Sequence, residues 1–176
     1  DVFISAGKKQ MDALQEGGFI VNDSRQNLLG NELVLIAPKD SKIETFDDLA
    51  TDKAAKISIG TPETVPAGKY AQEALITLKL WEPIQPKLVM AKDVRQVLTY
   101  VESENVDAGL VYRSDTIGSE KVRIVAAAPA DSHSPIVYPM AIVAASQQQE
   151  AAQEFATFLT SEPAKKVFEK YGFKSL

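Results

Sequence analysis

The sequence predicts an α/β fold in which most strands run parallel. Short runs rich in valine and isoleucine alternate along the chain with segments whose apolar residues recur at helical spacing. Apolar residues make up 45% of the 176 residues, which is enough to fill a core. A chain of this length forms one domain or two small lobes.

Strands are expected wherever a short apolar run is bounded by turn residues. Such runs fall at residues 2–5, 32–37, 56–60, 87–90, 107–112, 122–126 and 137–144. Helices are expected between and after them. One face of a helix is marked by the spacing of Val94, Val97, Leu98 and Val101. The same spacing predicts helices at 68–80, 155–159 and 164–171.

Turn residues along the chain predict an inserted lobe. Pro38 follows one strongly apolar strand, Pro135 precedes another, and a self-sufficient α/β segment lies between them. We therefore expect a complete second lobe at 38–135, joined by two crossing strands to a first lobe formed by 1–37 and 136–176. The first lobe is expected to be incomplete, because two or three strands are too few for a sheet covered on both faces. Its exposed apolar surface would favour dimerisation or strand exchange.

Composition excludes several classes of protein. The net charge of -5 argues against a nucleic-acid partner, whose phosphates need a basic face. The chain has no cysteine, so a disulfide scaffold, a thiolate metal site and a cysteine nucleophile are excluded. No apolar run approaches the ~20 residues of a membrane span. The first residues predict a strand, so we expect that a signal peptide has been removed from an exported protein.

An enzyme is not expected. The single histidine, His133, lies in a polar loop bounded by proline, and solvent exposure explains it better than catalysis. No nucleophile elbow, Walker A loop or dinucleotide fingerprint occurs. Asp47 with Asp48, and Glu102 with Glu104, are typical of solvated surface. We therefore expect no catalytic residue, no cofactor and no metal ion bound directly to the protein.

The segment 60–71, Gly-Thr-Pro-Glu-Thr-Val-Pro-Ala-Gly-Lys-Tyr-Ala, is the most informative stretch. A strand ends at Gly60, and Pro66 presets the backbone for a helix that starts near Ala67. The N–H groups of Ala67 and its neighbours then lie at the positive end of the helix dipole, where an anion binds favourably. An ordinary strand–loop–helix joint explains the same residues, and both interpretations stay open.

Two further positions are expected at the same edge of the sheet, because open α/β folds place their ligands at the carboxyl ends of the strands. Asp93 is expected to be an N-cap, which places the N–H of Val94 in the first turn of a helix. Tyr112 ends a strand, so its hydroxyl could donate to an anion. A tyrosine half-buried under a loop fits that position equally well. Arg113 alternates with Tyr112 and is expected to face elsewhere.

The sequence resembles the molybdate-binding proteins of bacterial ABC transporters. The resemblance rests on the runs 28–38, 62–71, 93–95, 108–115, 136–139 and 168–173, which occur in the family's order. It implies a class II periplasmic-binding-protein fold, in which two lobes joined by crossing hinge strands hold the oxyanion between them. It also implies that the ligand is held by the backbone amides of Ala67 and Val94 and by the hydroxyl of Tyr112.

The same resemblance implies two serine ligands that this sequence does not contain, because both lie upstream of the strand that begins at Asp1. Ser5 ends that strand, but we do not assign it as a replacement. The resemblance further implies an extracytoplasmic protein, periplasmic or membrane-anchored, that delivers molybdate or tungstate to the permease of an ABC importer.

The donor positions suit a fully deprotonated tetrahedral dianion, whose oxygens only accept hydrogen bonds. Protonated phosphate would need an acceptor, and none of the three positions supplies one. Sulfate shares the charge and shape of molybdate, so its exclusion would depend on the size of the site. Two alternatives stay open. One is a binding protein for another oxyanion such as sulfate, and the other is the effector-sensing domain of a transcription regulator, although no helix-turn-helix is visible.

Overall fold

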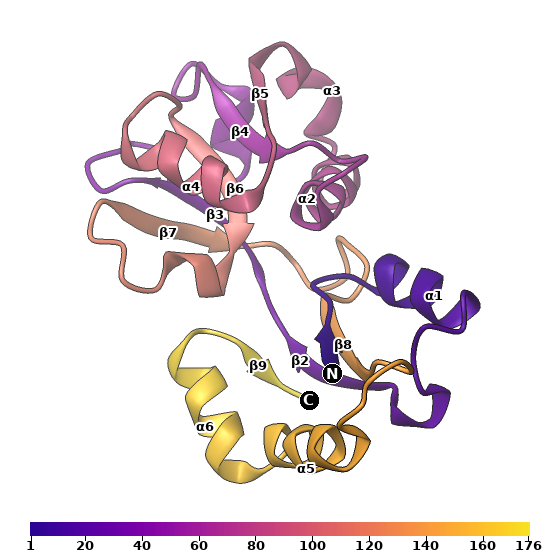
Figure 1. Cartoon of the computed structure of the whole chain (residues 1–176). Coiled ribbons are helices and arrows are strands. Elements are labelled where there is room, and N and C mark those ends of the chain that lie inside the picture. Colours follow the sequence, from indigo (N-terminus) through magenta and orange to yellow (C-terminus); the bar gives the residue numbers. More distant parts are fainter. The chain divides into compact units, whose positions relative to one another are not determined.

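The computed structural model describes residues 1–176, and they form two compact units. Unit 1 contains Asp1–Asn31 and Ile136–Leu176, and unit 2 contains Glu32–Pro135. The chain therefore passes from one unit to the other twice, first between β2 (Gln26–Gly30) and β3 (Leu33–Pro38) and again before β8 (Val137–Ile142) (Figure 1). An insertion of this kind was expected. The chain enters unit 2 after Asn31, whereas the prediction placed this boundary after residue 37.

Strand β3, Leu33–Pro38, lies in unit 2, whereas the predicted boundary after residue 37 assigned most of it to the first lobe. It pairs with β6, Ala108–Tyr112, on one side and with β7, Val122–Ala127, on the other. A hydrophobic run shows that a strand is buried, but only its hydrogen-bonded neighbours decide which sheet it joins. The crossing therefore falls at Asn31 and Glu32.

The sheet of unit 2 has the strand order β5-β4-β6-β3-β7. Strand β4, Ile57–Gly60, is parallel to both β6 and β5, which spans Leu88–Ala91. These parallel pairs follow from the helices α2, Pro66–Thr77, and α4, Val94–Glu102, because parallel neighbours need a crossover connection. Strand β3 is antiparallel to both of its neighbours, so the sheet is mixed.

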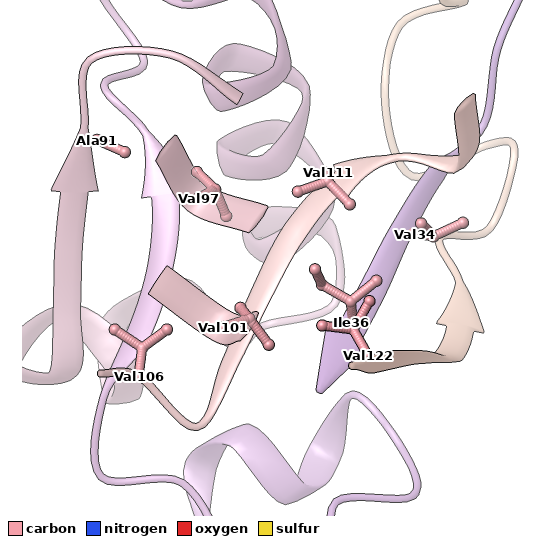
Figure 2. Close-up of a cluster of buried hydrophobic side chains, with 8 residues drawn as sticks. All are labelled: Val34, Ile36, Ala91, Val97, Val101, Val106, Val111 and Val122. Atoms are coloured by element: carbon pink, nitrogen blue, oxygen red, sulfur yellow. The ribbon is translucent and has the colours of Figure 1, made fainter. Parts of the chain in front are cut away.

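The two crossover helices cover opposite faces of this sheet. The chain passes from β4 through α2 to β5, and then back through α4 to β6, so two right-handed crossovers run in opposite directions. Figure 2 shows the face under α4, where Val97 and Val101 pack against Val34, Ile36 and Val111 of the sheet. The shorter helical segments of unit 2 are η2 (Asp47–Ala50), α3 (Trp81–Ile84), η3 (Gln85–Lys87) and η4 (Arg113–Thr116).

Unit 1 has an entirely antiparallel sheet with the strand order β1-β8-β2-β9. The strands are β1 (Val2–Ile4), β2 (Gln26–Gly30), β8 (Val137–Ile142) and β9 (Lys174–Ser175). The expectation of mostly parallel strands is wrong here. These strands come from both ends of the chain, so none of the pairs is joined by the strand–helix–strand unit that makes neighbours parallel.

Helices cover both faces of the unit 1 sheet, which was expected to be underfilled. On one face, Met140 packs with Leu28, Leu29 and residues of α5, Gln149–Leu159. On the other face, the neighbouring Ala141 packs with Met11 of α1, Lys8–Glu16. The remaining helical segments are η1 (Asn22–Ser24) and α6 (Glu162–Lys170). None of the chain's helices combines the length and the apolar character that crossing a membrane requires.

Candidate functional site

The three predicted positions lie at one edge of the unit 2 sheet. Strands β4, β5 and β6 are parallel, so their carboxyl ends meet at the same edge. In the register of these strands Gly60 pairs with Ala91, and Ile57 pairs with Ala108, the first residue of β6. Tyr112 is the last residue of β6, while Ala67 and Val94 lie in the first turns of the helices that follow β4 and β5.

Ala67 is the second residue of α2, after Pro66. The loop before it is anchored to the neighbouring strand, because the N–H and hydroxyl of Thr61 both donate to the carbonyl of Ala91, at 2.9 and 3.1 Å. The N–H of Lys69 donates to the carbonyl of Val65 at 3.1 Å and so begins the helical hydrogen bonds. The amides of Ala67 and Gly68 precede that bond, where a helix offers its N–H groups outward.

Two glycines set where α2 begins. A Cβ atom at Gly68 would lie 2.0 Å from the carbonyl oxygen of Gly60, and one at Gly60 would lie 2.5 Å from a methyl group of Val65. The backbone of the first helical turn therefore touches the backbone at the end of β4. Glycine at both positions is needed for this close approach, which brings the helix amides to the edge of the sheet.

Val94 is the first residue of α4, and Asp93 is its N-cap as predicted. The Asp93 carboxylate accepts a hydrogen bond from the N–H of Gln96 at 2.7 Å. The Gln96 side chain in turn accepts one from the N–H of Lys92 at 2.9 Å. These reciprocal bonds fix the direction in which the chain enters the helix, and they leave the amides of Val94 and Arg95 in the first turn.

Tyr112 is buried at the end of β6, and its backbone N–H donates to the Asp115 carboxylate at 3.0 Å. Val111 faces α4, so the alternation of a strand places the Tyr112 side chain on the opposite face, which α2 covers. Ala67 and Tyr112 therefore approach the edge from the α2 side of the sheet, and Val94 approaches it from the α4 side.

Arg113 is paired with Glu32, the residue immediately before β3. Its guanidinium forms an ion pair with Glu32, and its backbone N–H donates to the Glu32 carbonyl at 2.9 Å. Ser5 is also engaged locally, because its hydroxyl donates to the carbonyl of Gly7 at 2.7 Å. His133 is half-buried and not fully exposed, since its ring lies 5.9 Å from the ring of Tyr70.

Asp115 is the residue of this edge that the sequence analysis missed. Burial raises the pKa of its carboxyl above the ordinary value, and the hydrogen bond from the Tyr112 N–H and the nearby Arg95 guanidinium act in the opposite direction. Arg95 lies in the first turn of α4, next to Val94. The available signal was an aspartate three residues after the end of a strand, which is the spacing of a capping box.

A hollow of unit 2, of about 780 Å³, lies at the opposite edge of the sheet. Asp107 comes just before β6, and Glu102 ends α4, so this hollow surrounds the amino ends of the parallel strands. Lysine side chains and carboxylates both line it, and Ala67, Val94 and Tyr112 do not. No group of histidine and carboxylate side chains in the chain is placed to hold a metal ion.

Residues 1–174 match the family of bacterial extracellular solute-binding proteins. The chain belongs to this family. Its members are named for binding solutes outside the cell. The resemblance drawn from the sequence and the fold class it implied are confirmed.

Relatives of this solute-binding protein support the assignment. It is 50% identical to a putative ABC transporter substrate-binding lipoprotein of Bacillus subtilis, over 98% of its own length and 66% of that protein. It is 41% identical to the molybdate-binding protein ModA of Haemophilus influenzae, over 99% of its length and 70% of that protein. The solute-binding protein described here thus spans about two thirds of the length of these relatives.

A solved structure shares the fold. The substrate-binding domain of a putative molybdenum ABC transporter from Clostridium difficile superposes with a TM-score of 0.87 at 46% identity. The match covers all of this solute-binding protein and 77% of that chain.

Proposed function

We propose that this solute-binding protein captures molybdate or tungstate through neutral hydrogen-bond donors at the carboxyl edge of the unit 2 sheet. The donors are the backbone amides of Ala67 and Val94 and the hydroxyl of Tyr112. The observation that carries the proposal is the meeting of two helix N-termini and one strand end at this edge. The 41% identity to a protein named as molybdate-binding indicates which anion these donors receive.

The chemistry of the donors favours a fully deprotonated oxyanion. An amide N–H at a helix N-terminus and a phenolic hydroxyl can both donate, and each such bond to a charged partner contributes roughly 1.5–3 kcal/mol. The Asp115 carboxylate accepts the Tyr112 N–H, so its charge is engaged with the backbone. A dianion can therefore be held without a formally charged ligand from the protein.

The family and its relatives support a role in transport. We propose that the protein works outside the cytoplasm, either in the periplasm or anchored to the membrane, and delivers its oxyanion to the permease of an ABC importer. The relatives named as an ABC transporter lipoprotein and as a molybdate-binding protein support this proposal.

We also propose that unit 1 self-associates through exposed apolar side chains of its C-terminal segment. Phe155 and Phe158 of α5 are 51% and 53% exposed, and Val167 of α6 and Tyr171, the residue after α6, are both 53% exposed. Exposed large apolar side chains are typical of surfaces that associate.

Calorimetric titration of molybdate, tungstate, sulfate and phosphate into the protein tests the proposed ligand. We expect heat and a higher melting temperature with molybdate and tungstate, because a ligand at ~1,000 times its Kd stabilises the folded state by ~4 kcal/mol. Sulfate and phosphate are expected to leave both signals unchanged. Binding of sulfate alone would make this a sulfate-binding protein, and the absence of any response to molybdate and tungstate would refute the proposal.

A further inference from the structure

The turn that follows Tyr112 is held by several hydrogen bonds. Its first contact is the bond from the Tyr112 N–H to the Asp115 carboxylate at 3.0 Å. The hydroxyl of Thr116 donates to the carbonyl of Arg113 at 2.8 Å. The Arg113 N–H donates to the carbonyl of Glu32, the residue before β3, at 2.9 Å. The last residue of β6 is thus fixed by the residues that come immediately after it.

Asp115 lies in the short helix η4, which packs against α4, the helix that begins at Val94. Burial disfavours the charged form of its carboxyl and raises its pKa, and the hydrogen bond from the Tyr112 N–H acts in the opposite direction. Burying a carboxylate is costly unless partners compensate for the lost water. The direct contact that compensates here is the bond to the Tyr112 N–H at the end of β6.

We propose that Asp115 is a positioning residue of the oxyanion site, which holds the Tyr112 end of β6 in place through its hydrogen bond to the Tyr112 N–H. Asp115 acts through Tyr112 and does not touch the anion. The inference rests on the proposed function, because it assumes that Tyr112 is a ligand.

The role predicts different effects for two substitutions. Asp115→Ala removes the acceptor, so the end of β6 loses the bond to the Tyr112 N–H. Asp115→Asn keeps an oxygen that can accept that bond, although it removes the charge. A matched control is Asp107→Ala, because the Asp107 carboxylate also accepts backbone N–H groups, those of Ala55 and Lys56, both at 2.8 Å. Asp107 lies at the opposite edge of the sheet.

Molybdate titration of these variants tests the inference. We expect Asp115→Ala to raise the Kd by about tenfold or more, the scale of one hydrogen bond to a charged partner. Asp115→Asn should stay within about threefold of the wild type, and Asp107→Ala should not change the Kd, even if it lowers the melting temperature. In a Tyr112→Phe background, Asp115→Ala should add little further loss, because both changes act on the same contact.

A readout without ligand completes the test. The amide proton resonance of Tyr112 should move upfield in Asp115→Ala and stay close to the wild-type position in Asp115→Asn. If Asp115→Ala does not fold, Asp115→Glu replaces it, since one extra methylene displaces the carboxylate and should also raise the Kd.

The outcomes separate the two proposals. A wild-type protein that ignores molybdate and tungstate overturns the proposed function and this inference together. A wild type that binds, with losses from Asp115→Ala and Tyr112→Phe that multiply independently, overturns the positioning role alone. An unchanged Kd in a folded Asp115→Ala variant does the same.

Discussion

The backbone of Gly68 rests directly on the carbonyl of Gly60, so that a Cβ atom at position 68 would lie 2.0 Å from that oxygen. The first turn of α2 therefore cannot move away from the end of β4 without losing its packing, and it cannot accept a side chain at that point. This contact places the Ala67 amide at the edge of the sheet, and it is open to a direct test.

Gly68→Ala is expected to destabilise unit 2 by about 1–3 kcal/mol, the usual cost of overpacking a tight contact, and to weaken molybdate binding. Thermal or denaturant unfolding with a parallel titration measures both effects. Lys69→Ala is the control, because the Lys69 side chain is 64% exposed and its loss should cost less than about 0.5 kcal/mol. A Gly68→Ala protein as stable as the wild type would show that the first turn of α2 can move away from β4 to make room for a methyl group.

Tyr112→Phe is expected to weaken molybdate binding by roughly 1–3 kcal/mol, because it removes one hydroxyl donor and keeps the ring. The melting temperature without ligand should change little. Calorimetry of the variant measures the effect, with Tyr100→Phe as the control, since Tyr100 lies in α4 of the same unit. Equal affinities for wild type and Tyr112→Phe would remove Tyr112 from the ligand set.

Asp48 supplies a prediction about pH. The Lys53 ammonium and the N–H groups of Glu44 and Thr45 lower the pKa of the Asp48 carboxyl from 3.8 to about 2. Because the folded-state value is the lower one, these contacts stabilise the fold fully above pH 3.8, and that stability is lost as the pH falls through about 2. Asp48→Asn should therefore lower the melting temperature at neutral pH.

The difference in melting temperature between Asp48→Asn and the wild type should become steadily smaller as the pH falls from about 4 towards 2. Asp47→Asn is the matched control, because Asp47 is next to Asp48 in the sequence and its side chain is exposed. A difference that stays constant over this range would show that the Asp48 contacts do not depend on its charge.

Self-association through unit 1 predicts that molecular mass measured by light scattering rises with protein concentration. Replacing Phe158, which is 53% exposed, by serine should return the protein to the monomer mass. Met90→Ser is the control, because Met90 is 45% exposed but lies in β5 of unit 2. A wild type that stays monomeric at every concentration would contradict the proposal.

Local chemistry explains which parts of the fold were predictable. Strand β4 has two isoleucines in alternation with serine and ends in glycine, and the Asp93 cap needs only the residues beside it. Strand β2, Gln26–Gly30, was missed because Gln-Asn-Leu-Leu-Gly has no β-branched residue, and its strand form depends on pairing with β8. The antiparallel sheet of unit 1 was missed for the same reason, since its pairing joins distant parts of the chain.

The candidate site was likewise predictable only in part. Ala67, Val94 and Tyr112 stand at joints that the order of strands and helices reveals, so their shared edge was predictable from the sequence. Asp115 carried a local signal, the spacing of a capping box after the end of β6, but its burial depends on the packing of the folded unit.

The interleaved order of unit 1 has a consequence for synthesis on the ribosome. Strand β8 lies between β1 and β2, so the sheet of unit 1 cannot close until residues 137–142 have been translated. Every strand of unit 2 has been translated by then, since its last strand ends at Ala127. Domains tend to fold as units while the chain grows. We therefore expect unit 2 to fold first, while the opening segment of the chain waits for its partner strand.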